Sequence, residues 1–325
     1  MSYTMCSRVT FPKTDRRSEL VLYLLSTCSI QSSWKMLTDT AEIVIPRKIK
    51  AFGGKKLKDV FLPGDPVTIE LGYNGDMIRE FSGYILSVSR GVPVIIKMED
   101  EMYKLKRKTV SYSRKSVTLS TMLSDILPEY KVNTVYGETE LGAVRYSNVL
   151  VSSILEDLKK KTGLYSYFID GILHVGNALT MSDTEEVYIH LERNAVSQNL
   201  QETGGDYEVT ASAILKGGKK LESTAGTKGA ETFRFTVNSK DDKITVKTLA
   251  EMAQRIYKQL KRQKYKGGIE LFGIPSVVPG MIIRLESDIT PEMNGRYYVE
   301  KVEKTFSDNA TYRQNIELGG QINDD

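Results

Sequence analysis

Two stretches of this chain, more than two hundred residues apart, follow one plan: a Pro-Gly corner, an alternating strand, a polar turn and a second strand. The corner is Pro63-Gly64 in the first stretch and Pro279-Gly280 in the second. Alternating apolar residues follow each corner: Val67, Ile69 and Leu71 in the first copy, and Met281, Ile283 and Leu285 in the second. Strict alternation is typical of half-buried strands. We therefore predict a duplicated β-barrel scaffold.

Each copy also contains an Asn-Gly pair, Asn74-Gly75 in the first and Asn294-Gly295 in the second. Asn-Gly supplies the positive φ angles that tight hairpin turns require, so we expect both copies to be hairpins of a closed or nearly closed sheet. The match is approximate, because Gly64 and Tyr84 are 20 positions apart, whereas Gly280 and Tyr298 are 18 apart. The expected structural turns involve Pro63, Gly64, Gly83, Pro279, Gly280, Asn294 and Gly295.

Length and composition limit the possible classes of protein. A chain of 325 residues is longer than one typical core, so we expect two or three domains. The 45 basic and 41 acidic residues leave a net charge of +4, which argues against nucleic-acid binding through the overall field. The only cysteines are Cys6 and Cys28, so disulfides cannot be the framework of the fold and folding in a reducing cytoplasm is expected.

The segment from Leu20 to Leu25 weakly imitates a lipoprotein signal peptide, because basic residues precede it and Cys28 follows it. The apolar run is short and has Glu19 at its edge, so a strand is the favoured interpretation. No stretch approaches the ~20 apolar residues of a membrane span. We expect a soluble protein with no signal peptide and no membrane span.

The spacing of apolar residues along the sequence predicts an α+β fold that is mainly β. Residues 1–113 are expected to form an N-terminal β-barrel, residues 114–180 a small α+β module, and residues 181–325 a second β-barrel with a helix at about 244–264. In the module, apolar residues at helical spacing predict one helix that ends at Pro128 and another that ends before Gly163. Residues 217–229 are rich in glycine, lysine, serine and threonine and are expected to be an exposed loop.

Few residues in this chain suggest catalysis. The only histidines are His174 and His190; both lie in alternating strands, and neither has a cysteine or second histidine at ligand spacing. The run Glu99-Asp100-Glu101 is interpreted as a solvated edge, and no phosphate-binding loop or nucleophile elbow occurs. We therefore expect no enzyme activity, no catalytic or cofactor-binding residues, no cofactor and no metal site.

A basic face on the helix near 244–264 leaves one functional alternative open. Its members are Lys247, Arg255, Lys258, Lys261, Arg262 and Lys264. Such a face can neutralise phosphates, so a nucleic-acid-binding β-barrel module is the alternative function. A solvated helix back is the favoured interpretation, because Tyr257 and Tyr265 are the only aromatic candidates for stacking on bases.

Several motifs together resemble one family. They are the segment Ser33-Trp34-Lys35-Met36-Leu37-Thr38-Asp39-Thr40-Ala41, Pro63-Gly64-Asp65 with Gly72-Tyr73, Phe81-x-Gly83-Tyr84, Gly273-Ile274-Pro275, Pro279-Gly280, Asn294-Gly295-x-Tyr297, Val299-x-x-Val302 and a last strand through Tyr312, Ile316 and Leu318. On these residues the chain resembles the baseplate hub proteins of contractile phage tails, the late-control-protein-D-like group, which is related to the hub part of type VI secretion spikes. The resemblance covers nearly the whole chain.

The resemblance implies two tail-tube-like barrels in each subunit and a homotrimer, whose six barrels would adapt a six-fold tail tube to a three-fold spike. The implied partners are the tail tube protein, a separate spike protein and other baseplate proteins. Sequence-specific nucleic-acid binding is not expected, and the implied location is the virion tail baseplate. A carbohydrate hydrolase or cell-wall-binding protein is a third hypothesis, which rests only on the fact that such functions are common among β-rich tail proteins.

Overall fold

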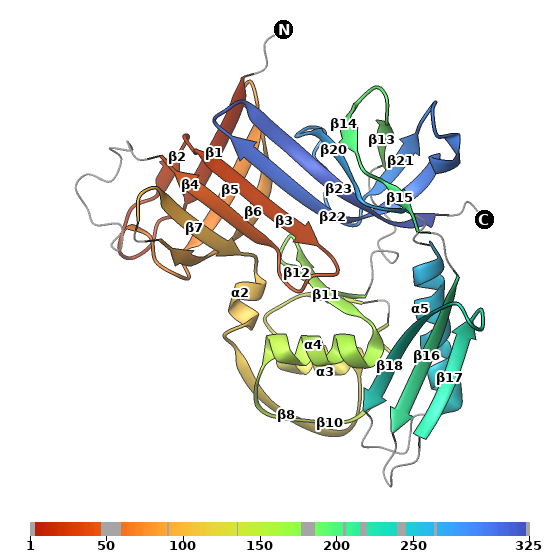
Figure 1. The fold of residues 1–325 in the computed structure, drawn as a ribbon. Helices are drawn as coiled ribbons and strands as arrows, with labels where there is room; N and C mark the ends of the chain where they lie inside the picture. Colours follow the sequence, from red (N-terminus) through yellow and green to blue (C-terminus); the bar gives the residue numbers. More distant parts are fainter. Residues whose placement is uncertain are drawn as a thin grey trace.

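The computed structural model describes residues 4–46, 60–89, 91–134, 136–176, 186–203, 206–214, 220–238, 245–262 and 265–322. Strands dominate the described residues, and a few helices lie between them (Figure 1). The predicted fold class, α+β and mainly β, is confirmed.

The first β-unit is a curved antiparallel arrangement of seven strands with the order β3-β4-β7-β6-β5-β1-β2. The strands are β1 (Met5–Phe11), β2 (Leu20–Leu22), β3 (Thr27–Ser33), β4 (Thr40–Ile45), β5 (Pro66–Tyr73), β6 (Asp76–Val88) and β7 (Val94–Glu99). Their inward residues form one apolar core, in which Phe11, Ile43, Ile69 and Ile96 are fully buried. The alternation predicted after Pro63-Gly64 is the inward face of β5.

The second β-unit contains the C-terminal strands. They are β13 (Glu186–His190), β14 (Ala195–Gln198), β20 (Gly268–Phe272), β21 (Ile282–Glu286), β22 (Gly295–Ser307) and β23 (Thr311–Ile322). β14, β20, β23 and β22 follow one another in the sheet, and β21 pairs with β22 on one side and with β13 on the other. The β13–β21 pairing is parallel, whereas the other pairings in this unit are antiparallel. The core of the unit includes Ile283, Leu285 and Val299.

The two β-units are joined edge to edge into one continuous sheet, because β22 pairs antiparallel with β3 (Figure 1). Lys301 lies opposite Ser33, and Ser307 lies opposite Thr27. β22 is long enough to serve both cores: Val302 belongs to the second core, and Phe306 belongs to the first. The β22–β23 hairpin therefore fuses the units both through backbone hydrogen bonds and through shared apolar packing.

The α+β module lies below the two β-units in the view of Figure 1 and has its own apolar core. After the short helix α2 (Met102–Leu105), it contains β8 (Thr109–Thr118), α3 (Leu119–Ile126), β9 (Val132–Asn133), β10 (Glu140–Leu150), α4 (Val151–Thr162), β11 (Tyr165–Ile169) and β12 (Ile172–Gly176). Both predicted helices are confirmed as α3 and α4. Gly163 ends α4 with a φ of 71°, the left-handed conformation that favours glycine.

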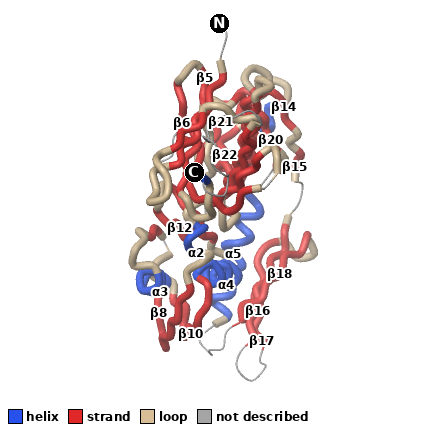
Figure 2. Tube along the Cα trace, turned by 90° about the vertical axis from the view of Figure 1, so that its left-hand side faces the viewer, coloured by secondary structure: helices blue, strands red, loops and turns tan. Residues whose placement is uncertain are grey.

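A further unit, of three strands and one helix, begins after β15 (Gln201–Glu202), which pairs with β19 (Tyr265–Lys266). It consists of β16 (Tyr207–Ile214), β17 (Lys220–Gly226), β18 (Glu231–Asn238) and α5 (Val246–Arg262). Leu249 and Ala253 of α5 pack on Val209 and Ala211 of β16 in a separate small core. Figure 2 shows this unit of β16, β17, β18 and α5 beside the helices of the module.

The domain boundaries expected from the sequence can be compared with these structural units. The expected boundary at residue 113 falls within β8, whose partner β10 belongs to the module. The expected second barrel, residues 181–325, includes the separate core of β16 and α5. The expected loop at 217–229 differs from the structure where it is described, because Lys220–Gly226 is the strand β17; residues 217–219 lie outside the described residues. No helix in the described part of the chain is long and apolar enough to cross a membrane.

Candidate functional site

The two Pro-Gly corners have the same backbone geometry. In the first, Asp65 N–H donates to Leu62 O over 3.1 Å, and in the second Met281 N–H donates to Val278 O over 3.2 Å. Gly64 has a φ of 91° and Gly280 a φ of 92°. A proline followed by a glycine with positive φ is typical of a type II turn. The same turn therefore occurs in both β-units.

The strand after each corner is also held in the same way. Gly64 N–H donates to Ile85 O over 2.8 Å, and Ile85 N–H donates to Asp65 O over 2.9 Å. In the second unit Val299 takes the place of Ile85: Gly280 N–H donates to Val299 O, and Val299 N–H donates to Met281 O, both over 2.9 Å. The repeated sequence plan thus corresponds to a repeated hydrogen-bond pattern.

The register of the hairpins matches the remaining residues of the two copies. Tyr84 lies opposite Pro66 and Tyr298 opposite Ile282, so the two tyrosines are equivalent. The neighbouring positions, Gly83 and Tyr297, are also equivalent and differ most in size. At Gly83 a Cβ atom would lie 2.1 Å from the carbonyl oxygen of Glu99 in β7. Close approach of two backbones therefore requires glycine in the first unit.

The tips of the two hairpins differ. In the first unit Tyr73 lies opposite Asp76, and the two residues between them, Asn74 and Gly75, have φ angles of 55° and 89°. Such a two-residue turn with both φ angles positive is the hairpin turn that Asn-Gly favours.

In the second unit the expectation of a tight turn at Asn294-Gly295 does not describe the structure. Asn294 is extended, with a φ of −60° and a ψ of 135°, and it ends a loop of residues 287–294 that includes the 3₁₀ helix η3 (Pro291–Met293). The Oδ1 atom of Asn294 accepts from Ser287 N–H over 2.7 Å, so its side chain closes the loop instead of its backbone forming a turn. The two-position difference in spacing gave no sign of this longer loop.

A buried polar cluster lies where the β-units meet. Glu80 of β6 forms an ion pair with Lys304 of β22 and accepts from the hydroxyl of Tyr312 in β23 over 2.7 Å. Lys304 Nζ also donates to Ser276 Oγ over 2.6 Å. The side chains of Lys304 and Glu80 are only 4% and 1% exposed. Burial lowers the pKa of Lys304, and burial together with Glu80 raises the pKa of the Tyr312 hydroxyl.

Trp34 lies where both β-units and the α+β module meet. Its Nε1–H donates to Val299 O over 3.2 Å, and its ring contacts Tyr165 of β11 edge to face with a centroid distance of 5.1 Å. Lys159 of α4 donates to Lys35 O over 3.1 Å. The segment that follows β3 therefore fixes the module beneath the joined β-units.

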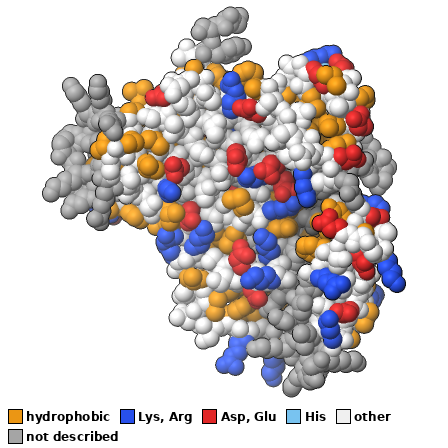
Figure 3. Space-filling model, viewed as in Figure 1, with side chains coloured by type: hydrophobic (Ala, Val, Ile, Leu, Met, Phe, Trp, Pro, Cys, Tyr) orange, Lys and Arg blue, Asp and Glu red, His pale blue; other side chains and the backbone are white. Residues whose placement is uncertain are grey.

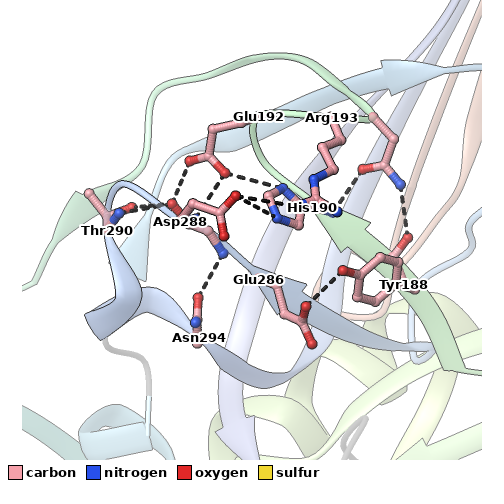
Figure 4. Close-up of polar contacts among 10 residues, drawn as sticks. Tyr188, His190, Glu192, Arg193, Glu286, Asp288, Thr290 and Asn294 are labelled. Atoms are coloured by element: carbon pink, nitrogen blue, oxygen red, sulfur yellow. Dashed lines mark hydrogen bonds and ion pairs between the residues drawn. The ribbon is translucent and has the colours of Figure 1, made fainter.

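His190 and two carboxylates form a second polar cluster, at the end of the second β-unit. Figure 4 shows His190 between Glu192 and Asp288. His190 Nδ1 lies 3.2 Å from Glu192 Oε2, and Nε2 lies 3.4 Å from Asp288 Oδ2. The imidazole is 4% exposed, whereas Asp288 is 70% exposed. These three side chains could hold a metal ion, because their candidate ligand atoms lie within 4.8 Å of one another.

The parallel pairing of β13 with β21 brings these groups together. His190 lies opposite Glu286, so the residues after each strand, Glu192 and Asp288, emerge at the same end of the unit. Asp288 is 98 positions from His190, so the three residues of the cluster do not stand at ligand spacing in the sequence. The local pattern His190-x-Glu192 was its only signal in the sequence.

The acidic run Glu99-Asp100-Glu101 differs from the expected solvated edge, because Glu99 and Asp100 are buried. Asp100 Oδ1 accepts from Met102 N–H over 3.0 Å at the start of α2, and the backbone N–H of Asp100 donates to Asp39 O. Burial raises the pKa of Asp100 well above its usual range and that of Asp39 to about 6. The run is therefore part of the packing below β7.

The basic face of α5 is partly engaged within the chain. The guanidinium of Arg255 lies 4.8 Å from the ring centre of Tyr136, and Lys261 Nζ donates to the hydroxyl of Tyr257 over 3.1 Å. Lys264 lies outside the described residues. On the face shown in Figure 3, acidic and basic side chains are interspersed. The other histidine, His174, stacks on Tyr167 with a centroid distance of 5.6 Å, and burial lowers its pKa.

Comparison by sequence finds no matching family model and no matching curated protein. Comparison by structure finds tail and secretion proteins. A tail protein from Neisseria meningitidis MC58 is 16% identical with a TM-score of 0.69, and the alignment covers 98% of this chain and 97% of that one. The 43 kDa tail protein of prophage MuSo2 from Shewanella oneidensis is 14% identical with a TM-score of 0.66, covering 97% and 98%.

A component of the Escherichia coli type VI secretion system, described as structurally similar to the T4 tail proteins gp27 and gp5, is 10% identical with a TM-score of 0.60. That alignment covers 91% of this chain and 73% of the other. At these identities the likeness shows the fold. The chain therefore has the fold of phage tail proteins and of their type VI secretion counterparts, and the resemblance predicted from the sequence is confirmed at that level.

Proposed function

We propose that this protein is the structural baseplate hub of a contractile phage tail or of a phage-derived injection apparatus. The observation that carries the proposal is the internal repeat: two β-units with the same corner turn and hairpin register, fused through β22 and β3. If each subunit contributes two equivalent β-units, a ring presents twice as many tube-like surfaces as it has subunits. Three copies in a ring would match a six-fold tube on one side and a three-fold spike on the other.

Ring closure in a homotrimer needs a heterologous contact, in which two different surfaces of the subunit meet. The continuous sheet offers two such surfaces, because its strand path ends at β2 and at β14. Large apolar side chains are exposed at both ends: Tyr23 and Leu24 directly after β2, and Val196 within β14. Uncovered strand edges with apolar side chains favour pairing with another chain. We place the subunit contact between these two ends.

The partners in this proposal are a second and third copy of the chain, the tail tube protein, a separate spike protein and other baseplate proteins. The location is the virion tail baseplate, and the role is mechanical instead of enzymatic. The engaged side chains on the face of α5 give no specific support to the alternative, a nucleic-acid-binding module.

The mass of the protein in solution tests the ring. Light scattering should give a species of 3 × 36.5 = 109.5 kDa, and negative-stain images of the same peak should show a central hole. A monomer that stays at 36.5 kDa after mixing with candidate spike and tube proteins would contradict the proposal.

Two edge variants locate the contact. Leu24→Glu and Val196→Glu each place a charge at one end of the strand path and should convert the trimer into monomers without loss of the circular dichroism signal. Val246→Glu is the matched control, because Val246 is 52% exposed at the start of α5, away from both edges. Trimers that persist in both edge variants would place the contact elsewhere.

A further inference from the structure

The cluster of His190, Glu192 and Asp288 combines one imidazole with two carboxylates. Both groups are ligands that first-row divalent metal ions use, at about 2.0–2.2 Å from the ion for Zn²⁺, so neighbouring ligand atoms of a tetrahedral site are about 3.4 Å apart. One ion binds one ring nitrogen, so only one of the two contacts can belong to the site: Nδ1 lies 3.2 Å from Glu192 Oε2, close to the separation of neighbouring ligand atoms. Asp288 lies on an exposed loop beside Nε2, and its candidate ligand atom is within 4.8 Å of the other two, so turning its carboxylate toward Nδ1 would complete the site.

The imidazole of His190 has an unsatisfied nitrogen in a buried position. His190 is almost fully buried, and its Nδ1 atom has no hydrogen bond. A neutral imidazole has one N–H and one lone pair, yet here both nitrogens face carboxylate oxygens. A metal ion bound at Nδ1 would use the lone pair of that nitrogen and would give the two nearby carboxylates a positively charged partner.

Further hydrogen bonds hold Glu192 and the backbone of His190 in place. Glu192 Oε1 accepts from the hydroxyl of Ser287 over 2.5 Å, and Oε2 accepts from Asp288 N–H over 3.1 Å. The backbone N–H of His190 donates to Asn194 Oδ1 over 2.8 Å. Such outer contacts fix the direction of the ligands and commonly contribute to metal affinity. Glu192 is thus held in place before any ion binds.

Among the described residues, Arg193 competes for Asp288 and is weakly placed. Arg193 Nη2 lies 3.4 Å from Asp288 Oδ2, and the two side chains are 71% and 70% exposed. Exposed ion pairs of this kind contribute little free energy, so Asp288 can exchange the guanidinium for a metal ion.

We propose that His190, Glu192 and Asp288 bind a divalent first-row transition-metal ion, with Zn²⁺ as the first ion to test. The imidazole favours zinc, nickel or copper over magnesium and calcium, and the carboxylates are compatible with zinc and manganese. The ion joins β13 to the loop between β21 and β22, two segments that are 96 positions apart at Glu192 and Asp288. Three protein ligands leave a fourth position for water or for a group of a neighbouring protein. This inference does not depend on the proposed hub function.

The test uses the full chain without an affinity tag, stripped of metal with a chelator. Equilibrium dialysis against Zn²⁺ with elemental analysis should give one ion per chain, and Co²⁺ should give the visible absorption of a four- or five-coordinate site. His190→Gln and Asp288→Asn should each weaken the affinity for Zn²⁺ by about 100-fold or more, beyond the 10- to 100-fold that loss of an outer contact costs.

Asp288→Asn keeps the interpretation clear if His190→Gln fails to fold, because Asp288 is exposed and its replacement has the same shape. His174→Gln is the matched control and should bind Zn²⁺ like the original chain. Absence of bound Zn²⁺, Mn²⁺, Ni²⁺ and Cu²⁺ at millimolar concentration would overturn the proposal. Equal Zn²⁺ binding in the original chain and in Asp288→Asn would also overturn it.

Discussion

The first and second β-units begin their central hairpin with the same corner and end it differently. At the corner, Gly64 and Gly280 have nearly the same φ and donate to equivalent carbonyl oxygens. At the tip, the first unit makes a two-residue turn, whereas the second makes a longer loop that contacts Glu192 in the segment after β13. The corner is tied into the sheet on both sides, so its geometry is constrained. The tip faces solvent, where extra residues are tolerated and where binding groups are commonly placed.

The comparison also separates two uses of the same register position. Gly83 in the first unit lets β6 approach the backbone of β7, whereas the equivalent Tyr297 in the second fills the core and donates its hydroxyl to Met293 O over 2.9 Å. The repeated scaffold therefore fixes the backbone path, and the residues at equivalent positions are free to diverge in size.

The largest expected effect concerns the charges that hold the two units together. Lys304→Ala leaves the carboxylate of Glu80 buried without its cation, so we expect a loss of about 3–5 kcal/mol in the free energy of unfolding. Lys301→Ala, on the same strand but in a partly exposed pair with Glu317, should cost less than about 1 kcal/mol. Denaturant unfolding followed by circular dichroism measures both. Similar losses in the two variants would show that the buried Lys304–Glu80 pair contributes no more to stability than the partly exposed Lys301–Glu317 pair.

The double variant Lys304→Met with Glu80→Leu sharpens this result. It removes both charges, so its loss should be smaller than that of Lys304→Ala alone, even though Tyr312 loses an acceptor. A double variant that is less stable than the single one would point to the hydrogen bonds of the cluster instead of its charges.

The second effect tests why the units differ at one register position. Gly83→Ala forces a Cβ against the carbonyl oxygen of Glu99 and should cost about 2–3 kcal/mol through displacement of β6 from β7. Ser82→Ala, the exposed neighbour on the same strand, should have little effect. Thermal unfolding of the two variants checks the prediction, and an unchanged melting temperature for Gly83→Ala would refute the close approach.

The third effect tests the equivalence of the corners. Gly64→Ala and Gly280→Ala each place a side chain at a positive φ, so each should cost about 1–2 kcal/mol, and the two losses should agree. Gly91→Ala is the control, because a Cβ there meets nothing within 4 Å. A clear difference between Gly64→Ala and Gly280→Ala in denaturant unfolding would show that the two corners are not energetically equivalent.

The smallest effect concerns Asp39, which lies in the first unit between β3 and β4. Burial raises its pKa in the folded chain to about 6 from an ordinary 3.8, so folding favours the protonated form and this contribution to stability is lost as pH rises through that window. Asp39→Asn cannot titrate. Relative to the original chain it should gain about 1 kcal/mol between pH 4 and pH 7, less than the full shift implies because Asp39 is only partly buried. Unfolding curves at both pH values give the difference, and a change of opposite sign would exclude a raised pKa.

The sequence predicted most of the local structure. The alternation after Pro63-Gly64 and Pro279-Gly280 gave β5 and β21, and apolar spacing gave α3 and α4, because these patterns follow from the periods of strands and helices. The prediction at Asn294-Gly295 failed for a reason that also follows from physics. Asn294 has a second way to satisfy the backbone, since its side chain accepts from Ser287 N–H across the loop.

What the sequence by itself determined is the repeat: the Pro-Gly corners, their strands and the likeness to tail hub proteins, all of which depend on residues close together in the chain. Only the tertiary structure decided which distant groups meet. The pairing of β22 with β3 places Lys304 on Glu80, and the pairing of β13 with β21 places Asp288 beside His190. Neither contact leaves a local pattern, because strand pairing joins segments of any separation once their edges and apolar faces fit.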